Sequence, residues 1–280
     1  MLRTIAVPAA GRQPAPSARP SRPRSPLRRS PHGRPGGAPE TCGPGPAATR
    51  PQALRLRARA AVVTIRAAVL PLYDTIPSRN PPVATWFLIG VHVVVFILEV
   101  RLPERELIGA LYTFGMVPAD LTFGAVPPWW TLVTCIFLHG GWLHLFANLW
   151  TLWIFGDNVE DRLGPARFVA FYLLCGVAAA VTELALHPTS TVPVVGASGA
   201  IAGVMGAYLA MFRESRIVLL VPVLFWPVFV QVSAFFFLFY WLLVQVLSGS
   251  FAPTGQAGGI AYGAHVGGFV AGLALHRLFL

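Results

Sequence analysis

The sequence has few charged residues and contains no lysine. Of its 280 residues, 11% are charged and 55% are hydrophobic. Soluble domains carry roughly a quarter charged residues, so a soluble fold of this composition would expose too much apolar surface to water. This argues against an ordinary soluble enzyme or binding domain, and we expect a membrane protein that lies in the lipid bilayer.

Acidic residues are nearly absent from the first 66 residues. This segment contains 13 Arg and one acid, Glu40, for a net charge of +12, whereas residues 67–280 contain 8 Arg and 10 acids, for a net charge of −2. The basic charge therefore belongs to the N-terminal segment. The rest of the chain gives no indication of a nucleic-acid partner.

Aliphatic residues are scarce in most of residues 1–68, which are rich in Pro, Arg, Ala and Gly. Such a segment buries too little apolar surface to offset the entropy lost on ordering, so we expect disorder. No apolar core with a small-residue cleavage site opens the chain, which argues against a secretory signal. An Arg-rich transit peptide is an alternative, although 12 prolines before residue 52 oppose the amphipathic helix that it needs. We favour a third interpretation, in which the start was assigned too far upstream and the protein begins near Val69.

Cysteine is also scarce. Cys42, Cys135 and Cys175 form no spaced framework, and two of them lie in apolar runs. We therefore expect free thiols, with no structural disulfide and no cysteine-based metal site.

Long apolar segments fill the remainder of the chain, residues 69–280. A membrane helix needs about 20 mostly apolar residues, and six segments approach this length. They are about Val83–Val100, Leu143–Val159, Phe168–Leu186, Ala197–Phe212, a helix from about Val230, and Gly259–Leu275. We therefore predict an all-α polytopic membrane protein built as a six-helix bundle.

Two further apolar segments are not predicted to cross the membrane by themselves. The run Ile217–Leu247 is too long for one span and contains Pro222 and Pro227, so its first part is interpreted as an interfacial lead-in to the fifth helix. Trp129–Leu138 is too short to cross, and Gly140-Gly141 separates it from the second helix. This pattern indicates an interfacial or re-entrant loop.

The arginines indicate an orientation. With the N-terminus in the cytoplasm, the outside segments hold Arg105, and Arg101 lies at the edge of the first helix. The inside segments hold Arg66, Arg79, Arg162, Arg167, Arg213, Arg216 and Arg277. Six helices with both termini in the cytoplasm therefore satisfy the positive-inside rule.

Ser198 lies where the fourth helix is predicted to begin, in the sequence Val195-Gly196-Ala197-Ser198-Gly199. The first turn of a helix has free backbone N–H groups and the positive end of the helix dipole. A nucleophile at this point would have oxyanion donors beside it. For this motif alone, a helix N-cap serine is the simpler alternative.

His265 is a candidate general base for Ser198. Small residues share its face of the sixth helix, and others form a face beside Ser198 on the fourth. These residues are Ala261, Gly268 and Gly272 on the sixth helix and Gly199, Gly203 and Gly206 on the fourth. Small residues at this spacing let membrane helices approach closely, and if the two faces meet, His265 comes within reach of the serine proton. The alternative is helix packing, with the histidine hydrogen-bonded to a carbonyl.

Other polar residues lie at membrane depth, where they are costly. His144 and Asn148 are four residues apart and share a face of the second helix, so both can donate hydrogen bonds to one oxyanion. Zinc would need three or four protein ligands, and no carboxylate is near within this span, so we expect no metal and no other cofactor. His92 and Glu183 have no partner that the sequence identifies, and we assign them to packing or to a water-filled interior.

Three motifs together resemble the rhomboid family of intramembrane serine proteases, in its bacterial form. They are His139-x-x-x-x-His144-x-x-x-Asn148, Gly196-Ala197-Ser198-Gly199 and Ala264-His265-x-x-Gly268-x-x-x-Gly272, in the family's order. The resemblance covers about residues 71–280. It implies a six-helix bundle around a water-filled cavity that opens to the outer face.

The resemblance also implies roles for individual residues. Ser198 would be the nucleophile and His265 the base of a dyad that needs no aspartate. His144, Asn148 and the backbone N–H of Ser198 would bind the oxyanion. The remaining residues would support the site: His139 in the first loop, Glu160 bracing that loop from the cytoplasmic end of the second helix, and Gly196 and Gly199 beside the serine.

The implied activity is hydrolysis of peptide bonds in or near the transmembrane segments of other membrane proteins. The implied substrates are single-span proteins cut after a small residue where their helix is unstable, and the implied location is the bacterial cytoplasmic membrane. A non-catalytic relative that binds membrane clients is the alternative, but such relatives lack the serine or the histidine. A transporter would need paired charges or internal repeats, and the sequence shows neither. The sequence does not indicate an oligomeric state.

Two positions depart from the family's pattern. An aromatic residue often stacks on the catalytic histidine from four residues after the serine, where this chain has Ala202. Trp-Arg is common in the first loop, whereas Trp130 is followed here by Thr131. These differences affect the packing of His265 and the rigidity of the loop, and they remove no reacting group.

Overall fold

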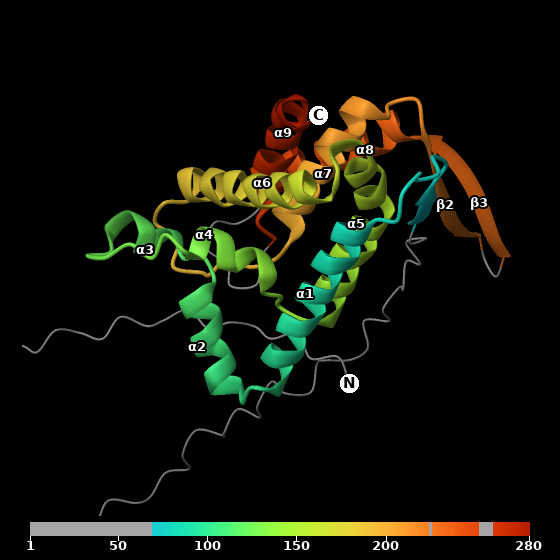
Figure 1. The fold of residues 1–280 in the computed structure, drawn as a ribbon. Coiled ribbons are helices and arrows are strands. Elements are labelled where there is room, and N and C mark those ends of the chain that lie inside the picture. Colours follow the sequence, from blue (N-terminus) through green and yellow to red (C-terminus); the bar gives the residue numbers. More distant parts are fainter. Residues whose placement is uncertain (1–68, 224–225, 252–259) are drawn as a thin grey trace, which may run out of the picture. The chain divides into compact units, whose positions relative to one another are not determined.

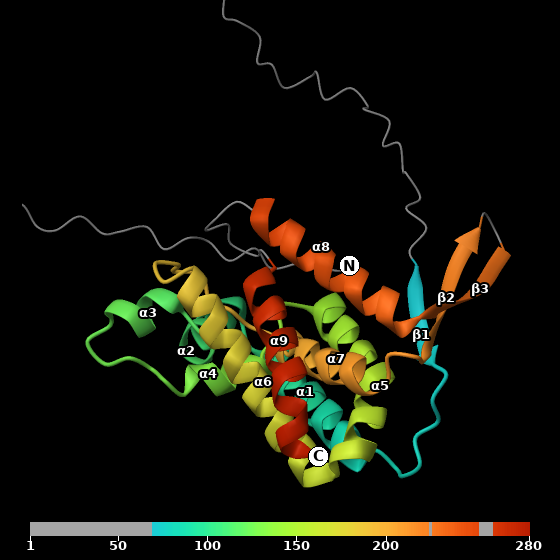
Figure 2. The same ribbon diagram turned by 90° about the horizontal axis from the view of Figure 1, so that it is seen from above.

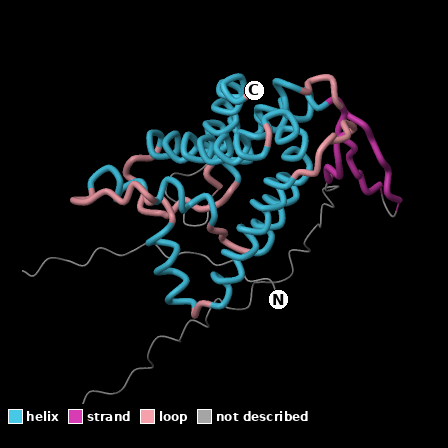
Figure 3. The backbone as a smooth tube through the Cα atoms, in the orientation of Figure 1, coloured by secondary structure: helices cyan, strands magenta, loops and turns pink. Residues whose placement is uncertain are grey.

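The computed structural model describes residues 69–223, 226–251 and 260–280, which are mostly helical. Figures 1 and 3 show the arrangement of these helices. The expected disorder of residues 1–68 and the thiol of Cys42 lie outside the described residues. Cys135 and Cys175 are buried free thiols, as expected.

Six long helices correspond to the six predicted ones. They are α1 (Val83–Arg101), α5 (Trp142–Leu163), α6 (Pro165–Leu186), α7 (Ser198–Met211), α8 (Ala234–Phe251) and α9 (Tyr262–Phe279). Three of them, α1, α6 and α8, are long and apolar enough by themselves to cross a membrane, and α5 joined with the short helices before it would be a fourth. By length and composition, the described residues thus contain three or four candidate spans, and α7 with its 14 residues is a shorter apolar helix.

The segment between α1 and α5 is a chain of short helices. They are α2 (Glu104–Phe114), α3 (Pro118–Phe123), α4 (Thr131–Thr134) and the 3-10 helix η1 (Cys135–Phe137). The pair α4–η1 meets α5 at a bend of 94°. Gly141 lies at this bend with φ = 153°, a conformation that favours glycine. The bend fits the interfacial or re-entrant loop predicted for Trp129–Leu138.

A three-stranded antiparallel sheet corrects the all-α prediction. Its strands are β1 (Leu70–Asp74), β2 (Arg216–Val223) and β3 (Trp226–Ser233), in the order β1-β2-β3. The strands β2 and β3 occupy the predicted interfacial lead-in to the fifth helix. Val, Ile and aromatic side chains favour strands, and Pro222 and Pro227, which oppose a helix, lie opposite each other in the sheet.

Side-chain hydrogen bonds tie the sheet to the helices. The indole N–H of Trp150 on α5 donates to the carbonyl oxygen of Pro71 (2.6 Å). Asp74, at the end of β1, accepts hydrogen bonds from Asn158 Nδ2 on α5 (2.8 Å) and from the hydroxyl of Tyr208 on α7. Strand β1 therefore runs along α5 and links it to α7.

Helix α7 lies among the other helices and positions the site. It contacts α5, α6, α8 and α9, and Figure 2 shows it between them. Ten of its 14 residues are buried. Its neighbours contribute large buried aromatic side chains to one core: Phe155 from α5, Phe168, Phe171 and Tyr172 from α6, and Phe269 from α9. This packing fixes the position of Ser198, the first residue of α7.

Candidate active site

Ser198 and His265 lie in hydrogen-bonding contact. Ser198 begins α7, and His265 lies in the first turn of α9. The distance between Ser198 Oγ and His265 Nε2 is 2.7 Å. Backbone N–H groups in the first turn of a helix have no intrahelical partner, and Ser198 is itself in the first turn of α7. The pair therefore has the geometry for proton transfer from a serine nucleophile to a base.

Glycines bring α7 and α9 together at this point. A Cβ added to Gly268 would collide with the carbonyl group of Gly199, and a Cβ added to Gly272 would collide with that of Gly203. Any larger residue at these positions would push the helices apart. The two small-residue faces meet as the sequence predicts, and this contact places His265 beside Ser198.

Two side chains of α8 also contact His265. Gln245 Oε1 lies 2.7 Å from His265 Nδ1. The Trp241 indole lies beside the imidazole, with ring centroids 5.9 Å apart and ring planes tilted by 33°. Neither residue is predicted from the sequence. The signal that could have found Gln245 is that it is a lone amide in an apolar helix, where an unpaired polar group is costly.

His144 and Asn148 of α5 lie beside Gly196, two residues before the serine. A Cβ added to Gly196 would lie 2.6 Å from His144 Cε1 and Nε2 and 3.8 Å from Asn148 Nδ2. Gly196 also has φ = 125°, a conformation that favours glycine. Asn148 Nδ2 is buried and has no hydrogen-bond partner within the described part of the chain. Its N–H groups are donors that a developing oxyanion could use.

His139 lies in the loop before α5 and is held by α1. Its backbone N–H lies 3.2 Å from each carboxylate oxygen of Glu99. Its ring stands edge-on to His144, with centroids 5.2 Å apart, and edge-on to His92 at 5.4 Å. His92 Nε2 in turn lies 2.9 Å from the hydroxyl of Tyr172. These contacts give His139 a position beside His144, and they identify Glu99 as an anchor of the loop that the sequence does not reveal.

Glu160 binds the start of α1, whereas the resemblance implies that it braces the first loop. Its two carboxylate oxygens accept hydrogen bonds from the backbone N–H groups of Ala84 (2.8 Å) and Thr85 (2.7 Å). These groups belong to the first turn of α1, where N–H groups lack an intrahelical partner and a negative charge is favourable. Glu160 therefore caps α1, and Glu99 holds the loop.

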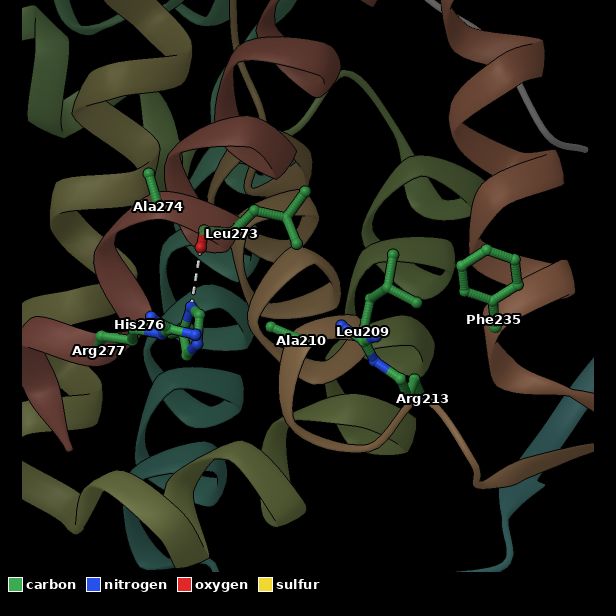
Figure 4. Close-up of a pocket in the computed structure, with 8 residues that line it drawn as sticks. All are labelled: Leu209, Ala210, Arg213, Phe235, Leu273, Ala274, His276 and Arg277. Carbon is green, nitrogen blue, oxygen red and sulfur yellow. Dashed lines mark hydrogen bonds between the residues drawn. The ribbon is translucent and has the colours of Figure 1, made fainter.

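A pocket of about 440 Å³ lies at the other end of α7. Figure 4 shows its lining, which comes from α7, α8, α9 and the turn after α7: Leu209, Ala210, Arg213, Phe235, Leu273, Ala274, His276 and Arg277. In it, His276 Nδ1 lies 2.8 Å from the carbonyl oxygen of Leu273. This pocket does not include Ser198, so it is separate from the Ser198–His265 pair.

The comparison with known families decides the class of protein. A family model described as the rhomboid domain matches residues 127–280. This match covers more than half of the chain and contains Ser198, His265, His144 and Asn148. The chain belongs to the rhomboid family. Apolar helices long enough to cross a bilayer agree with a membrane protein of this family.

Individual relatives of this rhomboid come from a plant and a bacterium. RHOMBOID-like protein 5 of Arabidopsis thaliana is 31% identical over 151 residues, which are 54% of this chain and 44% of the relative. Rhomboid protease GluP of Bacillus subtilis is 33% identical over 140 residues, 50% of this chain and 26% of GluP. Putative rhomboid protease YdcA of Bacillus subtilis is 41% identical over 91 residues, 32% of this chain and 45% of YdcA. The matched part of the chain thus spans less than half the length of each of these relatives.

Proposed function

We propose that this rhomboid is a serine protease that hydrolyses peptide bonds in or near the transmembrane segments of other membrane proteins. The observation that carries the proposal is the 2.7 Å contact between Ser198 Oγ and His265 Nε2. Family membership supports it, since the relatives GluP and YdcA are both named as rhomboid proteases.

The geometry supports a two-stage hydrolysis. Ser198 Oγ attacks the carbonyl carbon of the scissile bond while His265 Nε2 takes the hydroxyl proton. The negative charge that forms on the carbonyl oxygen is stabilised by hydrogen bonds from His144, Asn148 and the backbone N–H of Ser198. His265 then gives its proton to the leaving amine, which leaves an acyl-enzyme ester. Water hydrolyses this ester through the same proton transfers.

We further propose that residues 69–280 form one protease domain whose six long helices all lie in the membrane. Asp74 binds residues near the C-terminal ends of both α5 and α7, and the C-terminal end of α5 also caps α1 through Glu160. Arginines gather near these ends, at Arg162, Arg167, Arg213 and Arg216. The positive-inside rule supports a cytoplasmic location for them and for both termini, with Ser198 towards the outer face.

A reconstituted cleavage assay tests the proposed activity. The purified protein is placed in lipid vesicles with a single-span test substrate, and new N-termini are sequenced. We expect the wild type to cut in or next to the span, and we expect S198A and H265A to give no product while their thermal unfolding midpoints stay unchanged. A wild type that binds the substrate as S198A does, and never cleaves it, would indicate a client-binding protein instead. The proposed partners are single-span proteins of a bacterial cytoplasmic membrane.

A further inference from the structure

Gln245 is a buried amide on a helix whose side chains are mostly apolar. Its exposed fraction is 9%, and the other buried residues of α8 are Ala234 and Leu238. Many of the remaining large apolar side chains of α8, such as Phe236 and Tyr240, are exposed. Burying an amide without hydrogen bonds costs roughly 1–3 kcal/mol in proteins. The position of Gln245 in this helix therefore requires polar partners.

Both ends of the Gln245 amide have a partner. Its Nε2 donates to the carbonyl oxygen of Trp241 in the preceding turn (3.3 Å), and its Oε1 lies 2.7 Å from His265 Nδ1. If the amide were rotated by half a turn, Gln245 Oε1 would face the carbonyl oxygen of Trp241, and two acceptors would lie against each other. The amide therefore presents its oxygen, which can only accept, to the imidazole.

This contact determines which nitrogen of His265 carries the proton. Because Gln245 Oε1 accepts, His265 Nδ1 must donate, so the proton of the neutral ring is on Nδ1. His265 Nε2 is then free to accept the hydrogen bond from the Ser198 hydroxyl, 2.7 Å away. This is the tautomer that a general base for Ser198 requires.

Trp241 restricts the same ring from another direction. The centroid of its indole ring lies 5.9 Å from that of the imidazole and 6.0 Å from that of the Phe269 ring, and both pairs are tilted. Trp241 and Gln245 are four residues apart, so they lie on one face of α8. Helix α8 thus supplies both the hydrogen-bond acceptor and an aromatic neighbour of the histidine. Position 202 of α7, where the family often has an aromatic residue, is an alanine.

We propose that Gln245 is a positioning residue of the catalytic site, which holds His265 in the tautomer and orientation that accept the Ser198 proton. This inference rests on the proposed function and extends the pair to three side chains, from α7, α9 and α8. When Nε2 takes up the serine proton, the ring becomes an imidazolium and its Nδ1–H still donates to Gln245. A neutral amide performs this task at membrane depth without the cost of an ionised carboxylate. Since the acceptor belongs to α8, the base keeps its orientation only while α8 packs against α9.

The test compares three substitutions at one position with a matched control. Q245L removes the acceptor, Q245E keeps an acceptor oxygen, and Q245N shortens the side chain so that it no longer reaches His265. Q231L makes the same change at the exposed Gln231 of β3. A fluorophosphonate probe, which reacts with an activated serine, measures the labelling rate of Ser198 without a protein substrate. Cleavage of the single-span test substrate gives kcat and KM, and thermal unfolding checks that each variant folds.

We expect Q245L to slow labelling and to lower kcat about tenfold or more. This loss should be smaller than the loss of the general base itself, which contributes about 10²–10⁴-fold. KM should stay within about twofold, since Gln245 is buried and leaves little surface for a substrate. Q245E should be labelled faster than Q245L, and Q231L should match the wild type. A purely structural role predicts the reverse order, because a buried carboxylate is costlier than a buried leucine.

The outcomes separate the two proposals. Wild-type rates in Q245L, or faster labelling of Q245L than of Q245E, would overturn the inference about Gln245. If Q245L does not fold, labelling of Q245N at the wild-type rate would likewise overturn the inference about Gln245. A folded wild type that the probe does not label would overturn the proposed function itself, and the positioning role of Gln245 with it.

Discussion

Glu183 of α6 accepts a hydrogen bond from the backbone N–H of Ala264, the residue directly before His265 (3.0 Å). Its other carboxylate oxygen lies 2.8 Å from Nδ1 of His187, the residue that directly follows α6. Ala264 is in the first turn of α9, where backbone N–H groups have no intrahelical partner. Helix α6 thus anchors the turn that carries the histidine, and Glu183 has a partner that the sequence does not identify.

Removing this anchor should weaken both the fold and the site. Glu183→Ala leaves the buried N–H of Ala264 without an acceptor, which costs about 1–3 kcal/mol, and it should also lower the rate of substrate cleavage. Glu183→Gln keeps an acceptor oxygen, so it should lose less stability and less cleavage activity than Glu183→Ala. His187→Ala serves as the control, because His187 is partly exposed and such pairs contribute about 0–1 kcal/mol. Wild-type unfolding and cleavage in Glu183→Ala would contradict the anchoring role.

Asn148→Ala should reduce kcat and leave KM nearly unchanged. Loss of one oxyanion donor costs on the order of 10²–10³ in rate where it has been measured, and the loss here should be smaller because His144 and the backbone N–H remain. Asn80→Ala, at an exposed amide that binds Asp161, is a matched control and should cleave normally. Full activity in the double variant with alanine at both His144 and Asn148 would rule out the oxyanion role of these side chains.

The membrane helices could be predicted because their signal is local. Each long helix coincides with an apolar run, and the glycines of α7 and α9 mark the faces that meet. The sheet could not be predicted, because β1 pairs with a strand far along the chain: Leu70 lies opposite Leu220. Most side chains within Ile217–Leu247 are apolar. The spacing of the apolar residues therefore shows neither the period of a helix nor that of a strand.

The approach of His265 to Ser198 could be predicted because small residues mark the faces of α7 and α9 that meet. The role of the two residues as a dyad is implied by the family resemblance. Gln245, Trp241 and Glu183 could not be assigned, because their contacts depend on how α6 and α8 pack against α9. A lone polar residue in an apolar helix indicates that a partner exists. It does not indicate which helix supplies that partner.

The stability of the folded protein should fall as the pH rises from about 4 to 6 because of Asp74. Burial raises the pKa of the Asp74 carboxyl to about 6; the Tyr208 hydrogen bond opposes this rise, and the nearby charge of Asp157 adds to it. In the unfolded chain the pKa is about 3.9. The folded state therefore holds this proton more tightly, so its contribution to stability is complete below about pH 4 and is lost as the pH rises through 6.

Asp74→Asn isolates this effect. Both hydrogen bonds reach the same oxygen, Asp74 Oδ2, so an amide oxygen in its place can accept them without a charge. We expect the thermal unfolding midpoint of the variant to exceed that of the wild type at pH 7, and the difference to shrink towards pH 4. Each kcal/mol should correspond to roughly 2–4 °C. A difference that stays constant across this pH range would contradict the assignment.

Ala202 tests the packing around His265 most directly. It lies one helical turn after Ser198 and is completely buried, and its side chain is predicted to face the His265 ring. Because Trp241 already covers that ring, Ala202→Tyr should overpack the site. Such overpacking commonly costs about 1–3 kcal/mol, and it should appear as a lower thermal midpoint in detergent together with slower cleavage.

The double variant A202Y/W241A separates overpacking from a general loss of stability. Removing the indole makes room for the tyrosine. The tyrosine of α7 would then pack on the imidazole in place of Trp241 of α8. The double variant should then cleave faster than W241A alone, a coupling that independent sites do not show. If A202Y changes neither the cleavage rate nor the midpoint, Ala202 does not face His265. In that case Trp241 and Gln245 of α8 hold the ring without any contribution from this side of α7.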